Sequence, residues 1–127
     1  MKFIIDTHVL LWFDLDDTRL STNARSLMEA LDSEVTLSVA SAWEIAIKVS
    51  SGGLTLPEPV PAYFEGRIER GLRIAPIEWR HAAKVAELPF HHRDPFDRLI
   101  AAHALIENLP LVTRDPIFKK YGVKLIW

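Results

Sequence analysis

Hydrophobic and polar positions are grouped along the chain into blocks that predict strands and helices in turn. Short apolar, β-branched runs bounded by polar or turn-forming residues predict five strands, within residues 2–5, 35–38, 72–77, 109–113 and 123–127. Longer segments with apolar residues at helical spacing predict helices within residues 7–13, 21–31, 41–51, 61–70, 79–88 and 94–108. Because strands alternate with helices, the pattern predicts an α/β fold whose central, mostly parallel sheet is covered on both faces.

Cap-forming residues predict where several helices begin. Ser21 or Thr22 is expected to cap the helix that follows it. Ser41, with Glu44 three residues later, matches a capping box, so we expect the next helix to begin at Ser41. Asp94 is followed by a proline, which combines a good N-cap with the residue preferred at the first helical position.

The length and the apolar start of the chain agree with one compact unit. A chain of 127 residues suits a single domain, which we expect to span residues 1–127. The apolar N-terminal run is interrupted by Asp6 and is too short for a membrane span of about 20 residues. It also has no small-residue cleavage site, so we interpret it as a first core strand and helix rather than a signal peptide.

Composition and charge exclude several classes of site. The chain has no cysteine, which excludes disulfides, cysteine zinc sites and a thiol nucleophile and fits a reducing cytosol. The net charge of −2 is far from the basic balance of proteins that bind nucleic acid through bulk charge. A nucleic-acid partner would therefore have to be held by a local basic patch, by metal ions or by a dimer surface.

Four acidic side chains lie where strands end or helices begin. Asp6 directly follows the first strand, Glu44 lies a few residues after the second, and Asp115 lies two residues after the run 109–113. Asp97 is in the first turn of the helix that starts near residue 94. Helix capping and the helix dipole account for each acid singly. In an open parallel sheet, however, the carboxyl ends of the strands meet at one edge, so we expect these acids to lie together there.

A cluster of carboxylates has a chemical consequence. Two unit charges about 4 Å apart repel by roughly 4 kcal/mol at an effective dielectric constant of 20, so such a cluster requires a divalent cation or a raised pKa. Oxygen ligands, without cysteine or a paired-histidine motif, favour Mg²⁺ or Mn²⁺ over zinc. Phosphodiester hydrolysis uses such a site, because the metal activates water and offsets charge on the phosphate.

Four motifs, in order along essentially the whole chain, resemble those of the PIN-domain ribonucleases. They are Asp6 after FII, SVASAWE at 38–44, HRDPFDRLIAA at 92–102, and LVTRD at 111–115. The combination is most similar to the VapC toxins of bacterial toxin–antitoxin pairs. The resemblance implies a three-layer α/β/α sandwich and Mg²⁺- or Mn²⁺-dependent endonucleolytic cleavage of RNA in the cytoplasm. It also implies a homodimer and a cognate antitoxin that blocks the site.

The resemblance assigns roles to individual positions. The acidic quartet of the family, which binds the metal and carries the catalysis, matches Asp6, Glu44, Asp97 and Asp115. Thr113 matches a hydroxyl residue that supports the quartet, and Asp94 of the DPFDR signature is either a supporting residue or a helix cap. Arg98, Arg114 and Lys48 adjoin these motifs and are candidates for holding the RNA backbone, the positioning role that phosphate contacts play.

Aromatic and histidine side chains are weaker candidates. Trp43 adjoins Glu44 and could stack on a base, although packing in the core or in an interface is the commoner use of tryptophan. His91 and His92 are adjacent and cannot form the usual zinc pair of residues i and i+4. His103 lies in an apolar helical segment, where a packed or hydrogen-bonded histidine is expected.

Three other functions fit parts of the sequence. A haloacid-dehalogenase-like phosphatase resembles this chain at the end of the first strand, but needs a second aspartate where this chain has His8. A receiver-like Mg²⁺-binding signalling domain needs an acidic pair after the first strand, which Asp6 and Thr7 do not supply. An inactive PIN-fold module that only binds RNA or protein is disfavoured by the intact quartet.

Overall fold

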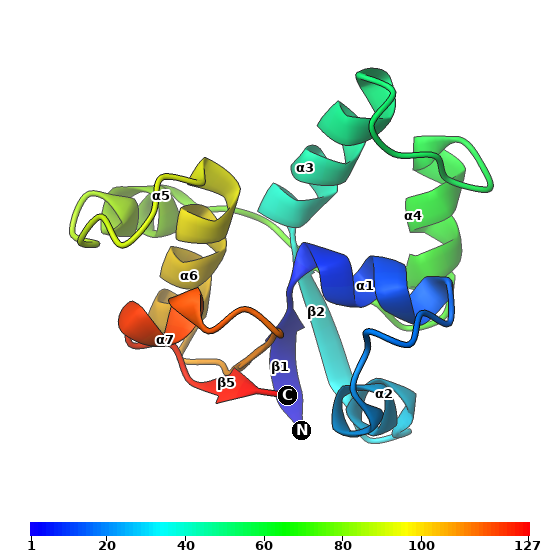
Figure 1. Ribbon diagram of the computed structural model, residues 1–127, viewed down its shortest axis with the longest axis horizontal. Helices are drawn as coiled ribbons and strands as arrows, with labels where there is room; N and C mark the ends of the chain where they lie inside the picture. The colour runs from blue at the N-terminus through cyan, green and yellow to red at the C-terminus, as the bar shows by residue number, and fades with distance from the viewer.

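The computed structural model describes residues 1–127 and places a five-stranded, all-parallel sheet at the centre of the molecule (Figure 1). The strands lie in the order β3-β2-β1-β4-β5. Their bounds are Lys2–Ile5 for β1, Glu34–Ser38 for β2, Arg73–Ala75 for β3, Leu111–Val112 for β4 and Leu125–Ile126 for β5. Because every neighbouring pair is parallel, all five strands end at the same edge of the sheet. This confirms the predicted α/β architecture.

Seven helices cover the sheet. None of them is both long enough and apolar enough to cross a membrane. They are α1 Thr7–Asp14, α2 Thr22–Glu29, α3 Val39–Ser50, α4 Val60–Glu69, α5 Trp79–Val85, α6 Pro95–Glu107 and α7 Ile117–Lys120. In Figure 1, α5, α6 and α7 lie on one side of β1, and α1, α2 and α4 lie on the other. The short helix α7 is not among the helices that the hydrophobic pattern predicts.

The first strand contributes to a hydrophobic core on each face of the sheet. Ile4 packs in a cluster that contains α6 residues such as Ile100. Phe3 and Ile5 pack in a second cluster with Val9 of α1 and residues of α2, α3 and α4. Successive side chains of a strand point to opposite faces, so a strand buried on both faces is apolar throughout. The three layers predicted from the sequence are thus present.

Two of the predicted helix starts are confirmed. The Ser21 hydroxyl accepts a hydrogen bond from the backbone N–H of Ala24 at 3.0 Å and caps α2. The Asp94 carboxylate accepts hydrogen bonds from the N–H groups of Phe96 and Asp97 at 2.9 and 3.1 Å and caps α6.

The predicted start of α3 is wrong. The helix begins at Val39, with Ser38 as its N-cap, and the Ser38 hydroxyl accepts a hydrogen bond from the N–H of Ala40 at 3.2 Å. Strand β2 runs directly into this cap, so the chain turns into the helix three residues before Ser41. Glu44 is therefore not a capping-box residue, and its carboxylate is carried into the helix body. The carboxylate is thereby free to contact other elements.

Candidate active site at the carboxyl edge of the sheet

The structure brings all four predicted acids together in one open hollow of about 410 Å³, which we call the acidic hollow. Five carboxylates line it: Asp6, Glu44, Asp94, Asp97 and Asp115. The remaining lining residues are His8, Trp12, Arg19, Lys48, Arg114 and Pro116. The hollow lies at the edge where the strands end: Asp6 follows β1, Asp115 follows β4, and α3 and α6 begin nearby (Figure 1). The expected meeting of the acids at this edge is therefore observed.

Thr113 connects the two acids that follow strands. Its hydroxyl donates to Oδ2 of Asp6 at 2.8 Å, and its oxygen accepts from the N–H of Asp115 at 3.1 Å. Asp6 is only 7% exposed, and burial raises its pKa above the usual value, against the lowering effect of the Thr113 hydroxyl. Asp6 occupies the N-cap position of α1, yet its side chain makes no capping bond. Capping is therefore not what holds this carboxylate in place.

Glu44 is held at both of its oxygens. Oε1 accepts a hydrogen bond from the Thr7 hydroxyl at 2.7 Å, and Oε2 lies 3.0 Å from the ammonium group of Lys48, one helical turn further along α3. The hydroxyls of Thr7 and Ser41 are 2.9 Å apart and complete this group. Lys48 is thus the positive charge closest to the quartet, and 42% of its side chain is still exposed to solvent in the acidic hollow.

Asp97 shows that the cluster lacks compensating charge. Burial raises its pKa to about 8, and the negative charges of Asp6, Asp94, Glu44 and Asp115 contribute to the same rise. An aspartate in water has a pKa near 3.8. Without a cation, this carboxyl group therefore keeps its proton at neutral pH.

Asp94 and Asp115 each use one oxygen to start a helix. Oδ1 of Asp94 caps α6, and Oδ1 of Asp115 accepts from the N–H of Ile117 at 2.9 Å at the start of α7. Both side chains also line the acidic hollow. The capping and the chemical interpretations of these acids are therefore compatible, because a carboxylate has two oxygens.

Comparisons with known proteins decide the family. A profile of the PIN domain matches residues 3–124. The chain belongs to the PIN-domain family. Ribonuclease VapC22 of Mycobacterium tuberculosis is 32% identical over 113 residues, which cover 88% of this chain and 85% of that protein. This likeness places the chain in the VapC branch that the sequence motifs resemble.

Solved structures share the architecture of this PIN domain. VapBC2 from Rickettsia felis, bound to a DNA fragment from its promoter, aligns with a TM-score of 0.75 and 20% identity over 99% of this chain and 98% of that chain. DNA-bound VapBC from Salmonella typhimurium aligns with a TM-score of 0.71 and 20% identity over 99% and 97%. These likenesses confirm the predicted PIN-like α/β/α fold.

The prediction that Arg98 holds RNA is wrong. The Arg98 side chain is buried, and its guanidinium donates to the backbone oxygens of Val85, Leu88 and Pro89 at 3.2, 3.2 and 2.9 Å. It lies over the ring of Phe90, 4.2 Å from the centroid. Consecutive residues of a helix point about 100° apart, so the residue after Asp97 is directed away from the hollow. Through these hydrogen bonds, Arg98 of α6 holds the end of α5 and the loop that follows it against α6.

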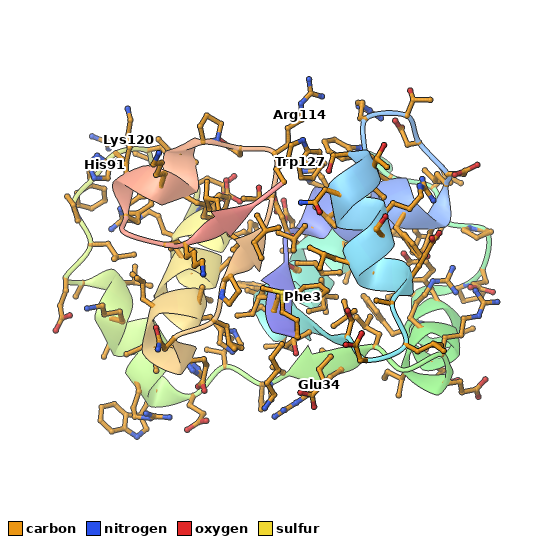
Figure 2. The ribbon with its side chains drawn as sticks, turned by 90° about the horizontal axis from the view of Figure 1, so that it is seen from below. Phe3, Glu34, His91, Arg114, Lys120 and Trp127 are labelled. Atoms are coloured by element: carbon orange, nitrogen blue, oxygen red, sulfur yellow. The ribbon has the colours of Figure 1, made fainter.

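Arg114 keeps the position that the RNA-binding prediction requires. It lines the acidic hollow, is exposed, and makes no ion pair. Figure 2 shows its side chain extending outward from the ribbon. Its charge is therefore available to a phosphate group.

The sequence analysis missed a contact of Asp97 with His92 and a contact of His92 with Tyr121. Nε2 of His92 lies 3.3 Å from Oδ2 of Asp97, and Nδ1 of His92 lies 2.6 Å from the hydroxyl of Tyr121. The sequence analysis considered His92 only as a member of a zinc pair with His91. No short-range spacing could have identified Tyr121, which lies 29 residues beyond His92.

Trp12 and His8 are aromatic residues in the lining of the acidic hollow. Their rings are 5.6 Å apart, and the Arg19 guanidinium lies 5.0 Å from the Trp12 ring centroid. Trp43 lies elsewhere. It is 61% exposed on α3, contacts Phe96 edge-on at 5.3 Å, and does not line the acidic hollow.

A second histidine cluster in the PIN domain is a hydrogen-bonded structural group. Nδ1 of His81 accepts the N–H of Glu78 at 2.9 Å, so the proton of this ring is on Nε2, which donates to Glu107 at 2.7 Å. Neither nitrogen then has a free lone pair for a metal. His103 packs against His81 with ring centroids 4.2 Å apart, and its pKa is lowered to about 4, chiefly by burial. The expectation that His103 is a packed, hydrogen-bonded residue is confirmed by its contact with Ser38 at 2.9 Å.

Proposed function

We propose that this PIN domain is a metal-dependent endoribonuclease that acts as the toxin of a toxin–antitoxin pair. The observation that carries the proposal is the convergence of Asp6, Glu44, Asp97 and Asp115 on one open hollow at the carboxyl edge of the sheet. The similarity to a protein named Ribonuclease VapC22 supports the choice of RNA as the substrate. The four acids are the proposed catalytic and metal-binding residues.

The residues of the acidic hollow fit Mg²⁺ or Mn²⁺. They offer carboxylate oxygens and no thiol, which is the donor set that hard divalent cations prefer. Burial, together with the negative charges of the neighbouring acids, raises the pKa of Asp97, and a divalent cation would offset those charges. When bound, such a cation lowers the pKa of a water molecule and offsets charge on the phosphate, which favours phosphodiester hydrolysis. Hydrolysis by water in line with the leaving oxygen would yield 5′-phosphate and 3′-hydroxyl ends.

The chain's own residues have distinct proposed roles around that chemistry. Thr113 fixes Asp6 relative to Asp115 through its two hydrogen bonds. Lys48 holds Glu44 in the free protein and, because its side chain is partly exposed, can reach a substrate phosphate. Arg114 offers an unpaired guanidinium at the rim for the RNA backbone.

The proposed partners are an antitoxin protein and a second copy of the chain. The structural neighbours are VapBC complexes, in which a toxin and its antitoxin are bound together, and we extend that arrangement to this chain. A homodimer is expected from the family resemblance. The structure offers for it an exposed apolar stripe on α3, formed by Val39, Trp43 and Ile47, which are 38%, 61% and 39% exposed. We expect the toxin to act in the cytoplasm, where RNA is present.

The decisive experiment is cleavage of end-labelled total RNA by the purified protein with Mg²⁺, with Mn²⁺ or with chelator. The Asp97→Asn variant should be inactive, because the substitution keeps the shape of the side chain and removes its charge. Asp32→Asn is the matched control, since Asp32 is exposed in the turn before β2 and does not line the hollow. Equal cleavage by Asp97→Asn, or cleavage in chelator, would contradict the proposal.

A further inference from the structure

We propose that Tyr121 and His92 are positioning residues for Asp97. The Arg98 guanidinium donates a hydrogen bond to Tyr121, Tyr121 donates to His92, and His92 donates to the Asp97 carboxylate. This series of hydrogen bonds sets the orientation of that carboxylate in the acidic hollow. The inference rests on the proposed function, because it concerns the same metal site. Its direct consequences are visible without RNA cleavage.

This series of hydrogen bonds begins at a fixed positive charge. Arg98 is 4% exposed and is held by three backbone oxygens, one from the last residue of α5 and two from the loop that follows it. Its Nη1 also lies 3.3 Å from the hydroxyl oxygen of Tyr121. A guanidinium has donors and no acceptor, so the hydrogen bond runs from Arg98 to Tyr121.

Counting donors determines the direction of the next bond. The Tyr121 oxygen accepts from Arg98 and from the backbone N–H of His92 at 3.2 Å. These two contacts use the acceptor capacity of the hydroxyl, so its own proton must be donated. Nδ1 of His92, at 2.6 Å, is the nearest acceptor, whereas the His92 backbone oxygen lies at 3.4 Å. Nδ1 of His92 is therefore unprotonated.

These hydrogen bonds also determine which ring nitrogen of His92 carries the proton. A neutral imidazole with an accepting Nδ1 carries its proton on Nε2, and that nitrogen lies 3.3 Å from Oδ2 of Asp97. His92 thus donates to one oxygen of Asp97 and leaves Oδ1 as the oxygen available to the hollow. A histidine whose far nitrogen is held by a second group cannot flip, which gives the carboxylate one preferred orientation.

The same residues join the elements that carry two of the acids. Tyr121 is the C-cap residue of α7, which begins just after Asp115 and Pro116, and His92 lies in the loop before α6. Tyr121 is 7% exposed, and the His91 ring covers it edge-on with centroids 4.9 Å apart. The hydrogen bonds of Tyr121 and His92 therefore set the position of α7 relative to α6 as well as the orientation of Asp97.

The test compares Tyr121→Phe, His92→Gln and His92→Phe with the unchanged chain. Tyr121→Phe removes one hydroxyl and keeps the ring. His92→Gln places an amide donor near the position of Nε2, and His92→Phe removes the donor. Partners that orient metal ligands in this way typically account for about 10- to 100-fold in metal affinity or activity. Tyr63→Phe is the matched control, because Tyr63 also donates a partly buried side-chain hydrogen bond, to Asp14, but does so outside the acidic hollow.

Three measurements are made at one pH and well below the melting temperature of each variant. We expect ¹⁵N-edited NMR of the imidazole to show the Nε2–H tautomer of His92 in the unchanged chain and a loss of that preference in Tyr121→Phe. We expect Mn²⁺ to bind about 10- to 100-fold more weakly to Tyr121→Phe and His92→Phe, and His92→Gln to recover part of the loss. With RNA, kcat should fall in the same order while KM changes little, because Lys48 and Arg114 are untouched.

The failure of this inference can be distinguished from the failure of the proposed function. An Nδ1–H tautomer in the unchanged chain would overturn the inference. So would Mn²⁺ affinity and kcat in Tyr121→Phe equal to those of Tyr63→Phe. If the tautomer and the Mn²⁺ affinities change as expected but no RNA is cleaved, the positioning role stands and the proposed ribonuclease activity fails.

Discussion

The Lys48 ammonium lies 3.0 Å from Oε2 of Glu44, so one member of the acidic quartet already has a cationic partner within the protein. The pair is formed by residues one turn apart on α3 and is partly exposed, which limits its contribution to about 1 kcal/mol or less. No lysine or arginine pairs with the remaining acids, and the pKa of Asp97 is raised by burial and by the negative charges of its neighbours.

Replacing Lys48 should have opposite effects on metal and on RNA. In Lys48→Met, Glu44 loses a competing cation, so Mn²⁺ should bind more tightly by up to about fivefold, which corresponds to the strength of a partly exposed ion pair. RNA should bind more weakly, because a phosphate contact is removed. Calorimetric titration with Mn²⁺ and the KM for cleavage measure the two effects. Lys120→Met, which changes an exposed lysine of α7, is the control. Weaker Mn²⁺ binding in Lys48→Met would contradict the competition.

Metal binding should depend on pH through Asp97. The pKa of about 8 means that this carboxyl group holds a proton at pH 7, and a cation must displace that proton to bind the carboxylate. We expect Mn²⁺ affinity to increase between pH 6 and 8 and to level off above 8, with close to one proton released per ion at pH 7. Titration in buffers of different ionisation enthalpy counts the protons. The Asp97→Asn variant should show a flatter pH dependence. A release that is unchanged in this variant would assign the proton to another group.

The metal-free protein should lose stability as the pH rises. The pKa of Asp97 is raised by folding, so its protonated form favours the native state. This contribution is complete below a pH of about 4, where the unfolded chain also holds the proton, and it is lost as the pH rises through about 8. Urea unfolding in chelator should therefore show a free energy of unfolding that declines between pH 5 and 8. Asp97→Asn should reduce this slope, and saturating Mn²⁺ should reverse the loss at pH 8. A slope that is the same in Asp97→Asn would argue against this assignment.

Arg98 and Arg114 should separate cleanly into structural and RNA-binding roles. Arg98→Met removes the guanidinium that donates to the oxygens of Val85, Leu88 and Pro89. The Val85 and Pro89 oxygens still accept backbone N–H groups, but the Leu88 oxygen is left without a donor, which costs about 1 to 3 kcal/mol. We expect a decrease of at least about 1 kcal/mol in the free energy of unfolding, measured with urea. Arg114→Met should leave that free energy within about 0.5 kcal/mol, as is usual for surface substitutions, and should raise the KM for RNA. A stable Arg98→Met variant with weakened RNA binding would restore the role first predicted for this residue.

Local patterns were sufficient for the elements and insufficient for some of their boundaries. The apolar run of β1 and the cap at Ser21 were predictable because both depend on neighbours within a few residues. The start of α3 was not, because Ser38 and Ser41 are equally good caps by residue type. The choice between them was made by β2, which extends to Ser38 through its pairing with β1 and β3.

The gathering of the acids at one edge was also predictable, because every strand of a parallel sheet ends on the same side. The positions of Asp6, Glu44, Asp97 and Asp115 followed from that rule, although Asp6, Asp97 and Asp115 also lie in or beside the start of a helix. Adjacency to an acid in the sequence did not predict which basic residues are exposed at the acidic hollow. Arg98 and Arg114 each adjoin a quartet acid, yet one is buried among carbonyl oxygens and the other is exposed.

The sequence by itself determined the alternation of strands and helices, the α/β class and the acidic residues that line the hollow. These features depend on hydrophobic period, capping chemistry and strand direction, which act over short distances along the chain. Only the tertiary structure decided that Lys48 pairs with Glu44 and that Tyr121 holds His92 against Asp97. It also decided that Arg98 is a structural residue. Side-chain hydrogen bonds depend on distances between elements that must be correct to within about an ångström, and on how many donors and acceptors compete at each atom. The spacing of residues along the sequence determines neither.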